Sequence, residues 1–298
     1  MKHYLVAVCA LSLFVLVLPA KQDDDAKKVK PINLSINTKA DEDDPNVSPD
    51  SLTLFYASNA DAKEYHLMFS ARRNMTQSWP AGKPLDDLNS KTDDRSPFLA
   101  TSNGKYPYFL YYATKKDESK KGGKGDNFDI YFAIKQGPQA DYTSATPVQS
   151  VCTAADELHP WVTGNGRELY FSRKAKDGWH VWVSAKPDGT GAFEKPKQLD
   201  LPVDFHHATL APDALTMYLQ GPLEKERWGL FRTTRASTKV DWSKPEPLDD
   251  LNNADGPTGD RSPCLNRDGS MLYFASDRPG GKGGLDLWVV QTSQLSKK

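Results

Sequence analysis

The chain has 298 residues, of which 38 are basic and 39 are acidic, so its formal net charge is −1. A nucleic-acid-binding protein needs a basic face or stripe, and this balanced charge therefore excludes nucleic acid as the expected partner. Aromatic residues make up 10% of the chain, and glycine and proline number 20 and 21. This composition fits a globular all-β protein with many turns.

The first 20 residues have the pattern of a secretory signal peptide. Lys2 and His3 precede an apolar run from Tyr4 to Leu18, and Pro19-Ala20 follow it. The run is shorter than the roughly 20 apolar residues that span a bilayer. We therefore expect cleavage and a periplasmic or secreted protein. An uncleaved membrane anchor is the alternative, because Leu18 occupies a position where a small residue is preferred. Residues 21–29 are charged without an apolar period and predict a disordered leader.

From residue 30 onward the sequence repeats with a period of roughly 40–50 residues, which is typical of propellers and solenoids. Each copy has a proline, or Ala208 in its place, and an aromatic ten residues later, except that the second copy carries a four-residue insertion. The pairs are Pro45 and Phe55, Pro97 and Tyr111, Pro160 and Tyr170, Ala208 and Tyr218, and Pro263 and Tyr273. Five blades follow, near residues 41–89, 90–150, 151–201, 202–251 and 252–298.

Each copy contains the signals of four strands. A turn such as Asp268-Gly269 separates two apolar runs, which predicts a hairpin. A third apolar run and an aromatic–proline–leucine segment follow, and a proline in a sheet belongs at an edge. The fifth copy lacks this last segment, but Lys30-Pro-Ile-Asn-Leu34 resembles it. The sequence therefore predicts one domain over 30–298, an all-β five-bladed propeller of four-stranded antiparallel blades. Residues 30–36 close its ring as an N-terminal strand.

The repeat resembles the WD40-like β-propeller repeat of the TolB type over about residues 30–296. The fifth blade matches it best, through Asp268-Gly269, Tyr273-Phe274, Gly280-Gly281 and Asp286-Leu287-Trp288. The resemblance implies the fold and a place in the cell envelope. It says little about activity, because propellers host many unrelated functions.

Two positions before the aligned proline carry most of the polar candidates. One residue before it stand Asp44, Ser96, His159, His207 and Ser262, and three residues before it stand Glu42, Asp94, Glu157, Phe205 and Asp260. Residues two apart on an extended strand point the same way, so both series are expected at one mouth of the channel. An acid that recurs in blade after blade usually ties a turn to its strand. The alternative is a carbohydrate-active hydrolase or lyase that uses two of Glu42, Asp94, Glu157 and Asp260 as acid and base.

The series next to the proline is irregular, which makes it the better candidate for binding. Asp44, His159 and His207 are a plausible ligand set for a divalent transition metal. The simpler interpretation is that the two histidines are polar residues in a solvated channel mouth that holds no cofactor. Arg95 and Arg261 stand at equivalent positions before Ser-Pro, where each guanidinium either clamps a partner's carboxylate or pairs with Asp94 or Asp260. The predicted binding residues are Asp44, Arg95, His159, His207 and Arg261.

Two other features are interpreted as structural. The segments 122–125 and 280–283 are Gly-Gly-Lys-Gly hairpin tips with no following helix, so they do not form phosphate loops. Cys152 and Cys264 belong to non-adjacent blades, which predicts no disulfide. The sequence thus favours a monomeric, non-catalytic module that binds an envelope protein or a glycan. A hydrolase or lyase and a TolB-like structural module are the alternatives.

Overall fold

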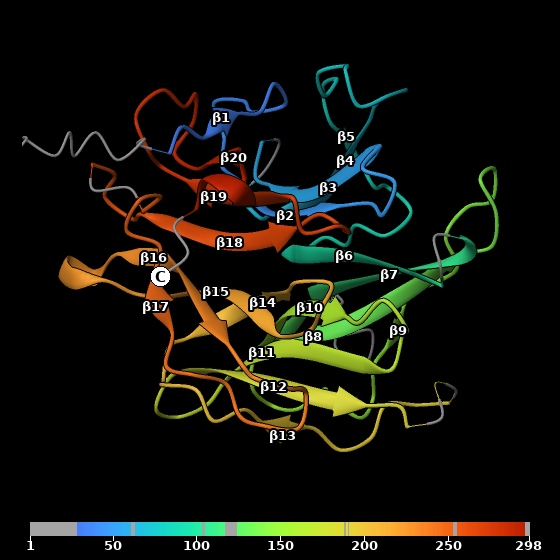
Figure 1. The fold of residues 1–298 in the computed structure, drawn as a ribbon. Helices are drawn as coiled ribbons and strands as arrows, with labels where there is room; N and C mark the ends of the chain where they lie inside the picture. Colours follow the sequence, from blue (N-terminus) through green and yellow to red (C-terminus); the bar gives the residue numbers. More distant parts are fainter. Residues whose placement is uncertain are drawn as a thin grey trace, which may run out of the picture.

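The computed structural model describes residues 29–295 apart from 61–62, 103–104, 117–123, 188, 190 and 253–254. The predicted signal peptide, almost all of the leader, the turn at 103–104 and half of the tip at 122–125 lie outside these residues. The described chain folds into five four-stranded antiparallel sheets arranged in a ring (Figure 1). The five innermost strands contact one another in order around the ring. This confirms the predicted five-bladed propeller. Within the described part of the chain, no helix has the length and apolarity to cross a membrane.

The blades share one strand plan. The innermost strands are β2 (Glu42–Val47), β6 (Asp94–Ser102), β10 (Glu157–Val162), β14 (His206–Leu210) and β18 (Asp260–Leu265). The second strands are β3 (Thr53–Ser58), β7 (Lys105–Lys116), β11 (Glu168–Lys174), β15 (Thr216–Pro222) and β19 (Met271–Ser276). The third strands are β4 (His66–Ala71), β8 (Lys124–Lys135), β12 (Trp179–Ala185), β16 (Trp228–Thr234) and β20 (Asp286–Gln291). The outer strands are β5 (Lys83–Pro84), β9 (Thr146–Pro147), β13 (Lys197–Gln198), β17 (Glu246–Pro247) and β1 (Ile32–Asn33). Two short 3₁₀ turns, Glu224–Glu226 and Thr292–Gln294, complete the elements.

The N-terminal strand closes the ring, as the sequence predicts. β1 pairs antiparallel with β20, with Ile32 opposite Val289. Leu34 and Ile36 are buried in the core that they share with the first and fifth blades. The Asn37 amide then donates to the Leu287 carbonyl at 2.9 Å and accepts from its N–H at 2.8 Å. The closing segment is therefore held by strand pairing, burial and a two-sided amide contact.

A bulge interrupts every innermost strand at the residue before the aligned proline. The pairing register shifts there in all five blades. Asp44, Ser96, His159, His207 and Ser262 have φ between 51° and 56°. Positive φ is uncommon for residues other than glycine, and five such residues at one repeat position mark a built feature. Because the strand is not extended here, the expectation that residues two apart share one orientation is wrong.

Candidate metal centre at the propeller axis

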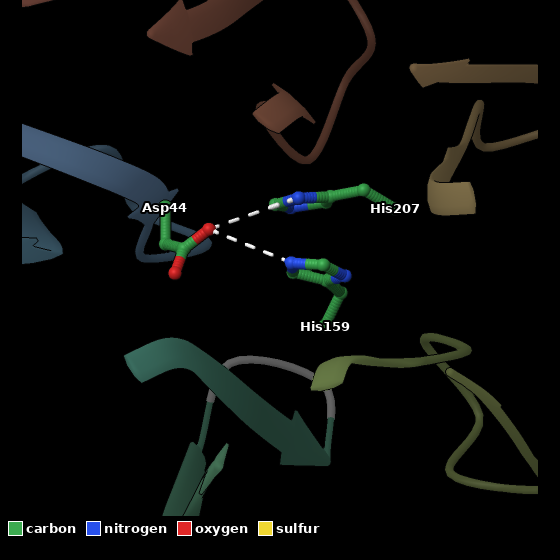
Figure 2. Close-up of side chains that lie close together, drawn as sticks. All are labelled: Asp44, His159 and His207. Atoms are coloured by element: carbon green, nitrogen blue, oxygen red, sulfur yellow. Dashed lines mark ion pairs between the residues drawn. The ribbon is translucent and has the colours of Figure 1, made fainter. Parts of the chain in front are cut away.

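Asp44, His159 and His207 come together from β2, β10 and β14 (Figure 2). His159 Nε2 lies 3.8 Å and His207 Nδ1 3.7 Å from the same carboxylate oxygen, Asp44 Oδ1. One ligand atom of each residue lies within 4.8 Å of the others. The bulges direct these side chains toward the axis, so residues from three blades form one cluster. The repeat position identified this trio in the sequence.

The cluster is buried and mostly satisfied by its neighbours. Asp44 Oδ2 accepts the N–H and the hydroxyl of Ser96, both at 3.0 Å. Asp44 Oδ1 accepts the Ser262 hydroxyl at 3.2 Å, so all five bulge residues converge. His207 Nδ1 is the exception, since it is buried and has no hydrogen-bond partner among the described residues. A buried polar atom left unpaired costs on the order of 1–3 kcal/mol.

Burial sets the protonation of the three groups. It lowers the pKa of His159 well below the ordinary histidine value and that of His207 to about 3, so both rings are neutral at pH 7. Burial, followed by the nearby Asp43 carboxylate, raises the pKa of Asp44 to about 6. Metal ligands must be neutral imidazoles and deprotonated carboxylates, and these three groups meet that condition at neutral pH.

The two nitrogen–oxygen separations are near those of a first-row divalent ion, and the stacked rings of His159 and His207, 18° from parallel, would tilt to direct both lone pairs at it. Ligand atoms bound at about 2.1 Å to a tetrahedral ion stand about 3.4 Å apart. The two nitrogen–oxygen distances here exceed that spacing by a few tenths of an ångström. Three protein ligands would leave a fourth position open, which is the arrangement of metal sites that bind water or a substrate.

Two supporting residues were missed in the sequence. Ser172 Oγ contacts His159 Nδ1 and accepts the His207 N–H, both at 2.9 Å. Gln220 accepts the Ser262 N–H at 2.9 Å and contacts His206 Nε2 at 2.8 Å. The equivalent second-strand positions of the other blades are Ala57, Ala113 and Ala275. Polar residues that replace a recurring alanine were the signal available in the sequence.

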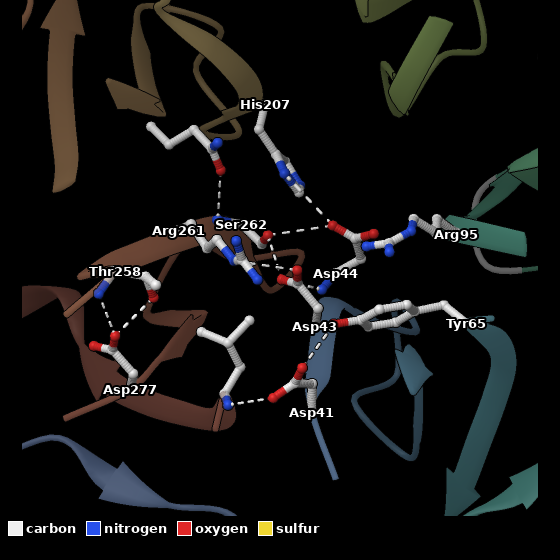
Figure 3. Close-up of polar contacts among 12 residues, drawn as sticks. Asp41, Asp43, Asp44, Tyr65, Arg95, His207, Thr258, Arg261, Ser262 and Asp277 are labelled. Atoms are coloured by element: carbon white, nitrogen blue, oxygen red, sulfur yellow. Dashed lines mark hydrogen bonds and ion pairs between the residues drawn. The ribbon is translucent and has the colours of Figure 1, made fainter. Parts of the chain in front are cut away.

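The two predicted arginines lie at the channel mouth, but in other pairs than those expected (Figure 3). Arg261 Nε lies 3.2 Å from Asp43 Oδ2, and the Arg95 guanidinium stacks on Tyr65 with Asp93 at 3.9 Å. Neighbouring residues on a strand face opposite sides, which turns Arg95 and Arg261 away from the acids beside them. Both side chains remain 26% exposed. Although burial alone would raise the pKa of Asp43, Arg261 holds it below the usual value.

The four recurring acids occupy the joints between loops and innermost strands. Each is fully buried. Glu157 accepts the Thr153 N–H and hydroxyl and pairs with Arg173 at 2.7 Å. Glu42 accepts from Thr38, Asp94 from Ser90, and Asp260 from Arg278 in the same way. These contacts match the role expected of an acid that recurs in blade after blade, which is to bind the turn before its strand. None of the four acids belongs to the Asp44 cluster.

No protein-family model matches the sequence, and no curated protein matches it significantly. Solved structures share the fold. The catalytic domain of a Coprinopsis cinerea GH62 α-L-arabinofuranosidase has a TM-score of 0.59 at 12% identity, over 89% of this chain and 95% of that one. A GH62 hydrolase in complex with xylotriose has a TM-score of 0.62 at 9% identity, over 88% and 97%. A putative TolB from Agrobacterium tumefaciens has a TM-score of 0.50 at 12% identity, over 86% and 78%. The chain is thus a five-bladed propeller whose fold is shared by GH62 glycosidases and by a putative TolB.

Proposed function

We propose that this protein binds a divalent transition-metal ion at the propeller axis through Asp44, His159 and His207. The observation that carries the proposal is the buried His207 Nδ1, which lacks a hydrogen-bond partner among the described residues and lies 3.7 Å from Asp44 Oδ1. A bound cation would satisfy this nitrogen and the carboxylate at once. Both imidazoles are already neutral, so binding would displace no proton from them.

The chain's own residues would set the properties of the centre. When bound, the ion would supply a Lewis acid with an open coordination position. Ser172 would hold the His159 ring so that its Nε2 faces the ion. Arg95 and Arg261, partly exposed at the mouth, would favour an anionic or oxygen-rich ligand beside it.

Metal content and affinity test this proposal. Protein purified without a His-tag, stripped with a chelator, should bind one Zn²⁺ or Ni²⁺ per chain in calorimetry. The double variant His159→Ala, His207→Ala should lose that binding. His66→Ala is the matched control, because His66 lies on β4 outside the cluster, and it should bind like the wild type. Equal and negligible binding by the wild type and the double variant would end the proposal.

A carbohydrate-active hydrolase or lyase is the second candidate. Structures that share the fold include arabinofuranosidases and a hydrolase with bound xylotriose. Asp43 and Asp44 also have pKa values shifted in opposite directions, as in many acid–base pairs. The four recurring acids are hydrogen-bonded where the loops meet the innermost strands. This candidate therefore depends on Asp43 and Asp44 at the channel mouth.

Turnover separates the two candidates. The second candidate predicts product release from aryl arabinosides or xylo-oligosaccharides that Asp44→Asn abolishes. Glu157→Gln, a change in a loop joint, should retain the turnover of whatever protein remains folded. Release of no product by metal-loaded and by metal-free protein would exclude this candidate for those substrates and leave metal binding untouched.

A further inference from the structure

A second cavity opens at the other end of the innermost strands. Its volume is about 700 Å³, within the range of small-molecule sites. Its lining comes mainly from the C-terminal ends of these strands and the turns after them, in all five blades, and is completed by residues such as Lys186 after β12. The bulge residues of the metal cluster stand near the opposite ends of the strands. Asn46, Phe98 and Trp161 line both this cavity and the small space beside Asp44, and therefore lie between the two.

At three of the five junctions, through Asn46, Thr209 and Cys264, the side chain after the aligned proline position accepts a backbone N–H of the next blade. Asn46 Oδ1 accepts the Leu99 N–H at 2.9 Å, from the first blade to the second. Thr209 Oγ1 accepts the Leu265 N–H at 3.2 Å, from the fourth blade to the fifth. These backbone donors face the channel and would otherwise lack a partner, which is costly for a buried amide.

Two of the five junctions break this rule. In the second and third blades the capping position holds Phe98 and Trp161, whose side chains offer no acceptor of that kind. The N–H groups equivalent to those of Leu99 and Leu265 belong to Val162 and Leu210, which also line the cavity. The aromatic pair thus lies beside backbone donors of the third and fourth blades, at positions where a neighbouring side chain elsewhere accepts the hydrogen bond.

The shape of the aromatic pair selects among ligands. The ring centroids of Phe98 and Trp161 are 6.0 Å apart, and the ring planes are inclined by 52°. Two rings so inclined cannot sandwich a single flat base, whereas successive sugar rings of a chain can each lay a C–H face on one of them. Both side chains are only partly buried, so their faces are accessible from the cavity.

The rim of the cavity is positively charged. Arg167, Lys186 and Arg267 line it, with Glu168 as the acidic residue among the lining side chains. Arg167 and Arg267 are exposed, and the Lys186 ammonium lies 4.2 Å from the Phe193 ring centroid. A guanidinium binds a carboxylate in a bidentate fork, so this rim suits a carboxylated ligand.

We propose that this cavity binds an acidic oligosaccharide. Its sugar rings pack on Phe98 and Trp161, its hydroxyl oxygens accept from the Val162 and Leu210 N–H groups, and its uronic carboxylates pair with Arg167 and Arg267. The site is distinct from the metal cluster and requires no metal.

Calorimetry on the full chain with trigalacturonic acid tests the proposal, with xylotriose and AMP as comparison ligands. We expect trigalacturonic acid to bind at least tenfold more tightly than xylotriose. The double variant Arg167→Ala, Arg267→Ala should lose at least tenfold in affinity for trigalacturonic acid, and Trp161→Ala should lose binding. Both arginines are exposed, so the double variant tests the rim without disturbing the core.

The metal cluster provides the matched control. Chelator-stripped and Zn²⁺-loaded wild-type protein should bind trigalacturonic acid with the same affinity, which separates this site from the metal proposal. Absence of binding, equal affinity for xylotriose, tighter binding of AMP, or wild-type affinity in the double arginine variant would each overturn the assignment.

Discussion

The imidazole rings of His159 and His207 stack face to face, with centroids 3.8 Å apart and planes 18° from parallel. They come from different blades, and the bulge in each innermost strand brings them to the axis. Stacked neutral rings leave Nε2 of one and Nδ1 of the other facing the same Asp44 oxygen. This relationship makes the axis a candidate metal site and leads to the predictions below.

At acidic pH, one proton per site, the one that binds Asp44, should compete with the metal ion. Asp44 has a pKa of about 6, whereas that of His207 is about 3 and that of His159 is also lowered by burial. As pH falls through about 6, Asp44 gains a proton and competes with the metal, whereas both imidazoles stay neutral. Affinity should therefore fall about tenfold per pH unit between pH 5.5 and 4.5. Competition titrations with a chromophoric chelator measure this slope. Release of two protons per bound metal ion would show instead that histidines with ordinary pKa values bind the ion.

Ser172→Ala should weaken metal binding without unfolding the blade. The hydroxyl positions the His159 ring and the backbone of His207. Loss of such an outer contact typically costs about 10–100-fold in metal affinity. Alanine already occupies the equivalent position in three blades, as at Ala57, so the fold accommodates it. Calorimetry with Zn²⁺ measures the effect, and unchanged affinity would remove Ser172 from the site.

Glu157→Ala should destabilise the fold and spare the metal site. Glu157 is fully buried, and its removal leaves Arg173, with 13% of its side chain exposed, without its carboxylate. Breaking a buried ion pair in this way costs about 3–5 kcal/mol. Urea denaturation should show that loss, whereas the folded variant keeps wild-type Zn²⁺ affinity. Weaker metal binding with unchanged stability would instead connect this acid to the site.

Ring closure should depend on the segment before residue 38. Deleting residues 1–37 removes β1, the buried Leu34 and Ile36 and the Asn37 contact, and leaves β20 as an open edge. Open edges recruit other chains, so the truncated protein should aggregate or lose cooperative unfolding. Asn37→Ala should cost about 1–3 kcal/mol, because the Leu287 N–H loses its partner, whereas the Leu287 carbonyl keeps the Leu34 N–H. Asn74→Ala, at an exposed loop position, is the control for the urea titration. A soluble truncation with an unchanged melting temperature would contradict closure by this strand.

The repeat made the fold readable from the sequence, because each proline-to-aromatic interval marks one blade. It also exposed Asp44, His159 and His207 as departures from a regular position. The bulge was not readable, since an αL residue other than glycine leaves no sequence signature. The partners of Arg95 and Arg261 were assigned wrongly for another reason, because adjacent residues on a strand face opposite sides. Contacts between blades, such as Ser172 with His207, required knowledge of which positions face each other across a junction.

Anomalous diffraction from crystals grown with zinc tests the central claim most directly. Data collected on both sides of the zinc absorption edge should show a peak at the propeller axis. The peak should lie about 2.0–2.2 Å from His159 Nε2, His207 Nδ1 and an Asp44 oxygen. A map with no axial peak, or with zinc bound only elsewhere, for example at His180 and Asp177 (3.1 Å apart), would contradict it.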